Sequence, residues 1–386
     1  MKRASQAALA FVASQLVLWT GCNAILGNGY GAFDESAVGP GGLGGEGGPE
    51  GDAAGGGEGG LGSDGNTTGD GDVGDAFVAD GRAPDGAVCP RMKCPTKLAS
   101  VVGPQRLAVD ATGVYWTTAA DVGRANLDGT GATPPIAVPG GPIVPSLTRG
   151  IALQGGVPYL TAADRGAAKC TANLSSCINT PFIGSAGTSS SLAVDASKVY
   201  VGIYDDGSGS GGLWQTDLNG ASPTPYTTPL DQVLGLRVVN SVAYFQTATD
   251  LKYVPSLSGS TFYAIASSGD VPVAFDVVGS NLVYATAAKL LRVCATSPTT
   301  SCNAPVLQAR MLAISAVIID GTQMIWAEGG ANGAVYRAAL SAGASVELLA
   351  DGQASPSDLA VDGTSIYWAN HGDSAGVGGA IMKLPK

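Results

Sequence analysis

Short apolar runs alternate with polar turns from about residue 96 to the end of the chain, in a recurring unit of four runs. An apolar run such as residues 192–194 is followed by a turn rich in Asp, Gly, Ser and Thr, and then by a second run that carries Tyr. A third run, such as residues 333–337, and a fourth, such as residues 346–349, complete the unit. Such runs, rich in β-branched and aromatic residues, are typical of antiparallel strands. No sustained 3.6-residue period follows the N-terminal stretch, so the pattern predicts an all-β fold.

One ten-residue phrase recurs through this region. It reads Leu-Ala-Val-Asp-Ala-Thr-Gly-Val-Tyr-Trp at residues 107–116 and Leu-Ala-Val-Asp-Gly-Thr-Ser-Ile-Tyr-Trp at residues 359–368. The repeats align on one position, which we name the anchor, and successive anchors are 44, 41, 44, 40, 41 and 42 residues apart. The seven anchors are Tyr115, Tyr159, Tyr200, Tyr244, Tyr284, Ile325 and Tyr367. Because sheets with two apolar faces are buried on both sides when they surround an axis, the repeat predicts a seven-bladed β-propeller with four antiparallel strands per blade.

The seventh repeat contains only three runs, because its last run, residues 380–385, lies at the end of the sequence. A fourth run is found ahead of the first repeat, at residues 97–102, and it resembles the fourth run of the sixth repeat at residues 346–352. We therefore expect the ring to be closed by a strand at 97–102 that pairs with the strand at 380–385.

An aspartate stands five residues before the anchor in four of the seven repeats. A ring of carboxylates could bind a cation, but each is followed by small turn residues, and Asp side chains accept backbone N–H bonds at such turns. We interpret these residues as turn formers rather than metal ligands: Asp110, Asp195, Asp320 and Asp362.

Residues 1–22 have the pattern of an export signal. A basic start, Lys2-Arg3, precedes a mostly apolar stretch at 7–19 that is too short to span a bilayer comfortably. The stretch ends in Leu-Trp-Thr-Gly-Cys at residues 18–22, which resembles a bacterial lipobox, and this resemblance implies lipidation of Cys22. Trp19 departs from the lipobox pattern, which prefers Leu there. The alternatives are a simple secretory signal and an uncleaved anchor.

Residues 23–88 have the composition of a disordered tether. The segment is dominated by Gly, has few large apolar residues, and carries twelve acidic residues and one basic residue. Its net charge of −11 equals that of the whole chain, so the acidity belongs to this segment. Such a composition cannot offset the entropy lost on ordering. Because no basic patch remains to neutralise phosphates, nucleic acid is not expected as a partner. The predicted division is a signal at 1–22, a tether at 23–88 and a propeller at 89–386.

The repeats resemble a known class of propeller. Tyr115-Trp116-Thr117, with echoes at residues 325–327 and 367–369, resembles the YWTD and NHL repeats of six- and seven-bladed propellers. The resemblance covers roughly residues 97–386. Together with the acidic Gly-rich tether it is most similar to the repeat domains of exported bacterial lipoproteins. Propellers perform many different functions, so the resemblance implies a fold and leaves the function open.

The seven cysteines agree with an exported chain. Besides Cys22 they form three local pairs, which we predict to be disulfides in an oxidising compartment. The pairs are Cys89–Cys94, Cys170–Cys177 and Cys294–Cys302. Zinc sites usually need tighter Cys or His motifs, and His371 is the only histidine in the chain, so no metal is predicted for the cysteines.

Ligands of propellers usually bind at the mouth of the central channel, where the loops after the second and fourth strands meet. Six polar residues of these loops are the candidate binding residues: Asp205, Asp206, Glu328, Asn370, His371 and Asp373. Since His371 is the only imidazole, any proton transfer by a histidine near neutral pH must use it.

Two functions are consistent with these features. The first is a non-catalytic binding or scaffolding propeller that needs no cofactor. It would be lipid-anchored at the bacterial cell envelope, with Asn23 compatible with the outer membrane, and would bind an envelope protein, a peptide or a glycan. The second is a metal-dependent lactonase- or lyase-like enzyme, because the loop at 370–373 resembles part of the sites of gluconolactonase-like and streptogramin-lyase-like propellers. This alternative requires a divalent cation and gives roles to His371 and Asp373.

Overall fold

The computed structural model describes a set of ranges within the 386 residues: 94–138, 150–161, 166–181, 188–204, 212–221, 223–227, 233–255, 263–266, 270–296, 302, 305–308 and 312–386. The predicted signal with Cys22, the tether at 23–88, and Cys89, Asp205 and Asp206 lie outside these ranges. Within them, no helix is long and apolar enough to cross a membrane.

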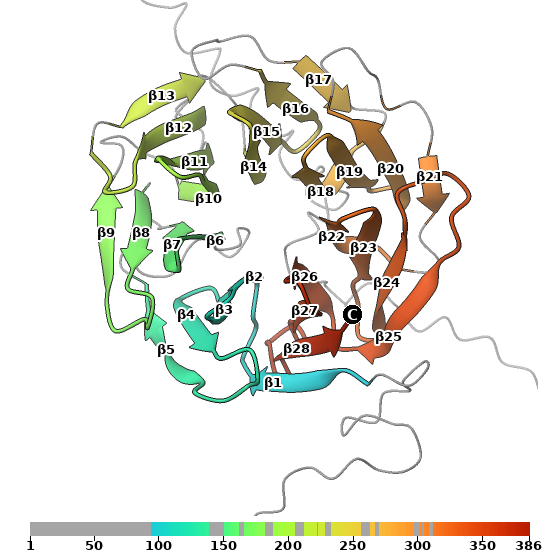
Figure 1. Cartoon of the computed structure of the whole chain (residues 1–386), viewed down its shortest axis with the longest axis horizontal. Helices are drawn as coiled ribbons and strands as arrows, with labels where there is room; N and C mark the ends of the chain where they lie inside the picture. The colour runs from blue at the N-terminus through green and yellow to red at the C-terminus, as the bar shows by residue number, and fades with distance from the viewer. Residues whose placement is uncertain are drawn as a thin grey trace, which may run out of the picture.

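Seven four-stranded antiparallel sheets are arranged in a ring around a central axis (Figure 1). This confirms the predicted seven-bladed β-propeller. Blades 1 to 6 follow one another along the chain, and in each the first strand is the innermost one, nearest the axis (Figure 1). The inner strand of a blade is also an edge strand of its sheet, so one side of its backbone faces the central channel and the neighbouring blades.

The strands of the first three blades are β2 (Arg106–Asp110), β3 (Gly113–Thr117), β4 (Asp121–Ala125) and β5 (Thr133–Ala137); β6 (Ile151–Gln154), β7 (Val157–Thr161), β8 (Gly166–Cys170) and β9 (Cys177–Pro181); and β10 (Thr188–Val194), β11 (Lys198–Tyr204), β12 (Gly212–Asp217) and β13 (Thr224–Thr227).

The next three blades contain β14 (Gly235–Val239), β15 (Val242–Gln246), β16 (Leu251–Val254) and β17 (Tyr263–Ala266); β18 (Pro272–Val278), β19 (Asn281–Thr286), β20 (Leu290–Ala295) and β21 (Pro305–Gln308); and β22 (Ile314–Asp320), β23 (Gln323–Glu328), β24 (Gly333–Ala339) and β25 (Glu347–Gln353). Blade 7 combines β26 (Pro356–Val361), β27 (Ser365–Asn370) and β28 (Ala380–Pro385) with β1 (Thr96–Ser100).

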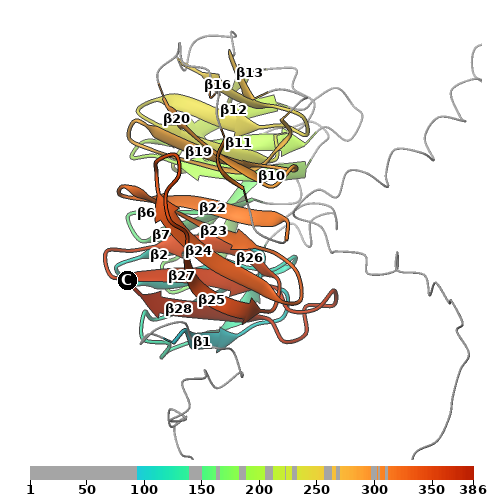
Figure 2. The same ribbon diagram turned by 90° about the vertical axis from the view of Figure 1, so that its right-hand side faces the viewer.

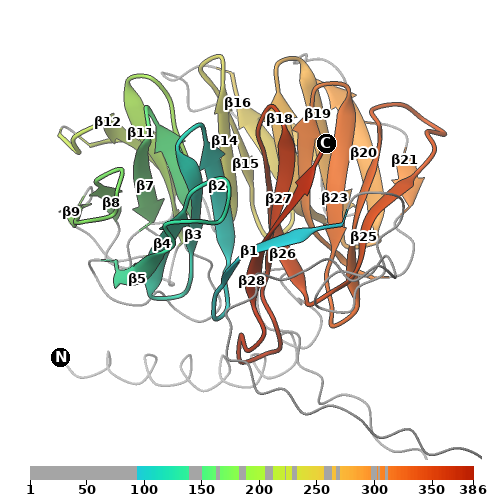
Figure 3. The ribbon, with the colours of Figure 1, turned by 60° about the horizontal axis from the view of Figure 1, so that its bottom comes forward.

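The ring is closed by the N-terminal strand, as predicted. β1 pairs antiparallel with β28 as the outermost strand of blade 7; Figure 2 shows the two strands side by side, and Figure 3 shows β1 in front of blade 7. The strand spans Thr96–Ser100 rather than the expected 97–102, because Ser100 is already paired with Ala380, the first residue of β28; a bulge lies between Lys97 and Ala99. Beyond the strand, the Val101 N–H donates to the Gly379 carbonyl at 2.9 Å, which extends the contact toward the β27–β28 loop.

The hydrophobic core is divided among the interfaces between neighbouring blades. Seven buried clusters occur among the described residues, and each contains residues from two adjacent blades; the cluster of blades 7 and 1, for example, joins Leu98 and Tyr367 to Trp116. Every anchor lies on the second strand of its blade and is buried. The repeated aromatic residue is therefore a packing element, and each blade is stable only against its neighbours.

Two of the predicted disulfides are confirmed. Cys170 is bonded to Cys177 and Cys294 to Cys302, and both bonds join the third strand of a blade to the outer segment that follows it. Cys94 is also disulfide-bonded, and its predicted partner, Cys89, lies outside the described residues.

The repeated aspartate forms a turn in three of its four occurrences. In blade 7, Asp362 Oδ1 accepts the N–H groups of Thr364 and Ser365 at 2.7 and 2.8 Å, while Oδ2 accepts the hydroxyl of the anchor Tyr367 at 2.8 Å. Asp195 makes the same contacts in blade 3, and Asp110 caps its turn in blade 1. In blade 6, where the anchor is Ile, Asp320 instead forms an ion pair with Lys386.

These contacts move the pKa values of both partners in blade 7. Burial alone raises the pKa of Asp362, but hydrogen bonds from Thr364, Tyr367 and Ser365 outweigh it and hold the pKa below its ordinary value of 3.8. Burial, together with the bond to Asp362, raises the pKa of Tyr367 to about 12.

We expect the Asp362→Asn variant to lose part of the acid sensitivity of folding. A carboxyl with a depressed folded pKa stabilises the fold above its unfolded pKa, and this contribution disappears as the pH falls through the folded pKa. Urea unfolding at pH 5 and pH 3 should therefore show a smaller drop in unfolding free energy for Asp362→Asn than for the wild type. The control is Asp351→Asn, since Asp351 is exposed and its carboxylate accepts the N–H of the adjacent Gly352. An unchanged drop in Asp362→Asn would contradict this account.

Candidate binding site in the central channel

One position of the repeat, nine residues before the anchor, places a residue in each inner strand or, in blade 2, directly before it. From blade 1 to blade 7 these residues are Arg106, Gly150, Ser191, Gly235, Phe275, Ala316 and Asp358. All except Ala316 line a partly open cavity of about 100 Å³, together with neighbouring residues such as Arg237 and Gln246. The cavity lies between inner strands that surround the axis (Figure 1), so it occupies the central channel.

Arg106 and Asp358 form an ion pair across the seam where the ring closes. They occupy equivalent positions in blades 1 and 7, and Arg106 Nη1 lies 3.5 Å from Asp358 Oδ1. The other carboxylate oxygen of Asp358 accepts the Leu107 N–H at 2.8 Å. Burial raises the pKa of Asp358, while Arg106, the Leu107 N–H and the more distant Arg237 oppose the shift. Asp358 thus connects blade 7 to both the side chain and the backbone of blade 1.

A second ion pair has the same construction on the other side of the channel. Arg237 Nε of blade 4 lies 3.0 Å from Asp276 Oδ1 of blade 5, and Asp276 Oδ2 accepts the Ile319 N–H of blade 6 at 2.9 Å. Arg237 Nη1 also donates to the Leu236 carbonyl at 3.1 Å. Inner strands are sheet edges, and unpaired edge N–H groups need partners. In both pairs the carboxylate supplies such a partner to the neighbouring blade.

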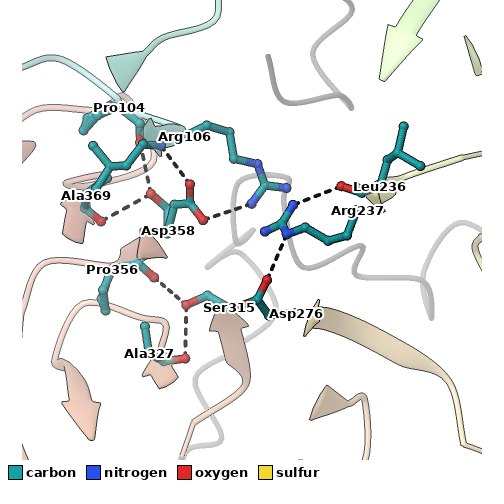
Figure 4. Close-up of polar contacts among 12 residues, drawn as sticks. Pro104, Arg106, Leu236, Arg237, Asp276, Ser315, Ala327, Pro356, Asp358 and Ala369 are labelled. Carbon is teal, nitrogen blue, oxygen red and sulfur yellow. Dashed lines mark hydrogen bonds and ion pairs between the residues drawn. The ribbon is translucent and has the colours of Figure 1, made fainter. Parts of the chain in front are cut away.

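The two guanidinium groups converge in the channel. Figure 4 shows the ends of Arg106 and Arg237 pointing toward each other from opposite sides of the close-up, each bonded to its aspartate. The Arg237 side chain remains 43% exposed, whereas its partner Asp276 is 12% exposed. The channel therefore presents Arg237 more openly than Asp276, whereas Arg106 and Asp358 are similarly exposed, at 18% and 14%.

Serine hydroxyls hold the inner strands together beside these pairs. In blades 3, 6 and 7 the residue ten positions before the anchor is a serine, and in each case it is skipped in a β-bulge. Ser315 Oγ lies 2.6 Å from the Pro356 carbonyl of the next blade and 3.2 Å from the Ala327 carbonyl of its own (Figure 4). Ser357 and Ser190 make the equivalent two contacts. The same serine contact therefore recurs in three blades and joins each inner strand to the next blade beside the cavity.

The sequence-predicted Glu328 and Asn370 are buried next to tryptophans. Glu328 Oε1 accepts from Trp326 Nε1 at 3.4 Å, and its Oε2 accepts the Leu312 N–H at 3.2 Å. Asn370 donates to Gln353 Oε1 at 3.0 Å, the same atom that accepts from the Trp368 indole. Both residues lie three positions after an anchor, at the ends of second strands in adjacent blades, and neither lines the cavity.

His371 and Asp373 lie in the loop between β27 and β28. His371 Nδ1 is 3.1 Å from the Asp373 carbonyl, and Asp373 Oδ1 accepts the N–H groups of Ala375 and Val377 at 2.9 and 2.8 Å. These contacts shape the loop. No group of three or more His, Cys, Asp or Glu side chains within the described ranges is placed to hold a metal ion.

The cavity and the predicted residues share one end of the channel, because Pro356 at the start of β26 is opposite Asn370 at the end of β27. The cavity is lined by different side chains, which the sequence interpretation missed. A signal was available: aligned on the anchors, the inner-strand position carries Arg106 and Asp358 where four of the other repeats carry Gly, Ser or Ala. Arg237 and Asp276 likewise interrupt apolar inner runs.

Comparison with known proteins supports the fold and does not identify a family. The chain matches no protein-family model and no curated protein. Among solved structures it is similar to the computationally designed Ika8 protein, with 12% sequence identity and a TM-score of 0.52 over 75% of this chain and 99% of that one. It is also similar to virginiamycin B lyase from Staphylococcus aureus, with 14% identity and a TM-score of 0.49 over 76% of this chain and 99% of the lyase. The first likeness concerns the fold alone, and we draw no conclusion from the second.

Proposed function

We propose that this protein is an envelope-anchored, non-catalytic binding propeller whose ligand enters the central channel. The observation that carries the proposal is the cavity, in which two arginines from blades 1 and 4 face each other on supports fixed by ion pairs and backbone hydrogen bonds. Groups held in place before a ligand arrives lose little entropy on binding, so such a cavity suits recognition.

The cysteines and the N-terminal sequence support a location outside the cytoplasm. The two disulfides at the rim point to an oxidising compartment. The export signal and the lipobox-like Cys22 add a route out of the cytoplasm and a lipid anchor. A flexible tether at residues 23–88 would give the propeller a mean reach of roughly 40–50 Å from the membrane, enough to meet an envelope protein, a peptide or a glycan.

Lipidation predicts a clear change in fractionation. In cells that produce the full-length chain, the wild type should sediment with membranes, and Cys22→Ser should be released after export or retained as an unprocessed precursor. Mass spectrometry of the N-terminal peptide should show acyl chains on Cys22 in the wild type alone. Cys94→Ser controls for the loss of a cysteine and should stay with the membrane. A wild-type protein found free of membranes and of lipid would overturn the anchoring.

Binding without turnover is tested by equilibrium dialysis of the purified full-length protein against small molecules extracted from cell envelopes. The expected result is a compound that is retained and recovered unchanged by the wild type and lost from Arg237→Gln. Arg337→Gln should retain it, because Arg337 pairs with Glu347 on blade 6 and does not line the cavity. Conversion of the retained compound into a product would contradict the non-catalytic function.

A further inference from the structure

We propose that the central cavity binds a carboxylate group, held between the guanidinium groups of Arg106 and Arg237. This assignment rests on the proposed binding function and names the chemistry of its ligand. It is carried by the direction in which the charged groups face, by the size of the cavity and by the geometry of guanidinium groups.

The charges that face the cavity are predominantly positive. Each aspartate uses one oxygen on its arginine and the other on a backbone N–H of an adjacent inner strand, at 2.8 Å for Asp358 and 2.9 Å for Asp276. Asp276 does not line the cavity, and Asp358, which does, is held by Arg106 and by the Leu107 N–H. Arg106 and Arg237 both line it (Figure 4). The cavity is thus lined by two cations and one acid, whose carboxylate already has two partners.

The volume limits the size of the inserted group. A cavity of about 100 Å³ exceeds the space that one water needs several-fold, yet it is smaller than the roughly 150 Å³ cavity that accepts benzene. A carboxylate, with three heavy atoms in a plane, fits this range. It also matches the planar fork of a guanidinium, which binds carboxylates with two parallel N–H···O bonds. The guanidinium fork also binds phosphate with two bonds, so inorganic phosphate is the competing ligand in the test.

The source of the carboxylate is a small organic acid or the C-terminus of a peptide, because the cavity is partly open to the channel. The two sources share the same recognition chemistry. They differ in whether the chain beyond the carboxylate extends along the channel, which a peptide probe detects.

Ligand-observed NMR with the full-length protein tests the assignment. The probes are acetate, its neutral isostere acetamide, methylammonium, inorganic phosphate, and acetyl-glycyl-glycine with a free or an amidated C-terminus. We expect acetate to bind with millimolar affinity, at least tenfold more tightly than acetamide, methylammonium or phosphate. Arg237→Gln should weaken acetate binding at least tenfold, and Arg337→Gln should leave it unchanged. Arg106→Gln should give the same loss as Arg237→Gln, with thermal melting of each variant showing that it is folded.

The outcomes separate the ligand class from the binding function. If the peptide acid binds and its amide does not, the carboxylate can belong to a peptide; if only acetate binds, the ligand is a small acid. Equal binding of acetate and acetamide, or tighter binding of phosphate, would overturn the carboxylate assignment while leaving the cavity as the binding site. Binding of none of the probes by a folded wild-type protein would overturn both.

Discussion

A chain that begins at Pro104, and so lacks β1, is expected to lose its cooperative unfolding transition. Without β1, the outer edge of β28 loses its hydrogen-bond partners, and Leu98 and Val101 no longer cover the cluster between blades 7 and 1. Burial of each of these side chains is worth about 1.5–3 kcal/mol, and the lost strand pairing adds to this. The sum approaches the whole stability of a typical domain, about 5–15 kcal/mol. Calorimetry and circular dichroism should show a broad, non-cooperative melt.

A chain that begins at Cys94 is the matched control, because it keeps β1, and it should melt like the full-length protein. Addition of a synthetic peptide of residues 95–103 to the shorter chain should restore a cooperative transition, since the peptide can add itself to the exposed edge of β28. A chain beginning at Pro104 that melts with wild-type cooperativity would show that the ring does not depend on its closing strand.

The Trp368→Ala substitution is expected to destabilise the fold by about 3–5 kcal/mol. Trp368 is fully buried between blades 6 and 7, and its indole N–H donates to Gln353 Oε1 at 2.9 Å. The substitution creates a large cavity and removes one of the two donors to a buried amide oxygen. Urea unfolding at neutral pH measures the loss.

Trp214→Ala controls for the removal of an indole. Trp214 lies on the third strand of blade 3 and is only partly buried, so its loss should cost clearly less than that of Trp368. Equal losses from the two substitutions would mean that the second-strand aromatics have no special weight in blade packing.

The architecture was predictable because it depends on repetition. The anchors recur at a nearly constant interval, an unmatched run at residues 97–102 stands ahead of the first repeat, and the seventh repeat lacks one run, so the number of blades and their closure followed. The bounds of β1 were less accurate because the strand ends at Ser100, opposite the first residue of β28, although the apolar run continues through Val101 and Val102. The aspartate turns were predictable because the turn residues directly follow Asp110, Asp195 and Asp362 in the sequence.

The cavity was not predicted because its residues are far apart in the chain and its chemistry depends on which side chains face inward. Arg106 and Asp358 meet only because the ring closes between blades 7 and 1. The sequence analysis selected polar loop residues as binding groups. In the structure, Glu328 bonds a tryptophan indole and Asn370 bonds the glutamine that accepts from another. His371 and Asp373 make hydrogen bonds within their own loop. The polarity of a residue near a channel mouth does not show whether it binds a ligand or stabilises the fold. The hydrogen-bond partners of its side chain, which only the structure gives, make that distinction.

The claim that the central cavity is the binding site is tested most directly by a crystal structure of the full-length protein soaked in acetate. The account predicts planar density for one carboxylate within hydrogen-bond distance of both Arg106 and Arg237, and no such density in crystals soaked in acetamide. Acetate bound at other surfaces, with the space between the two arginines filled by water alone, would contradict it.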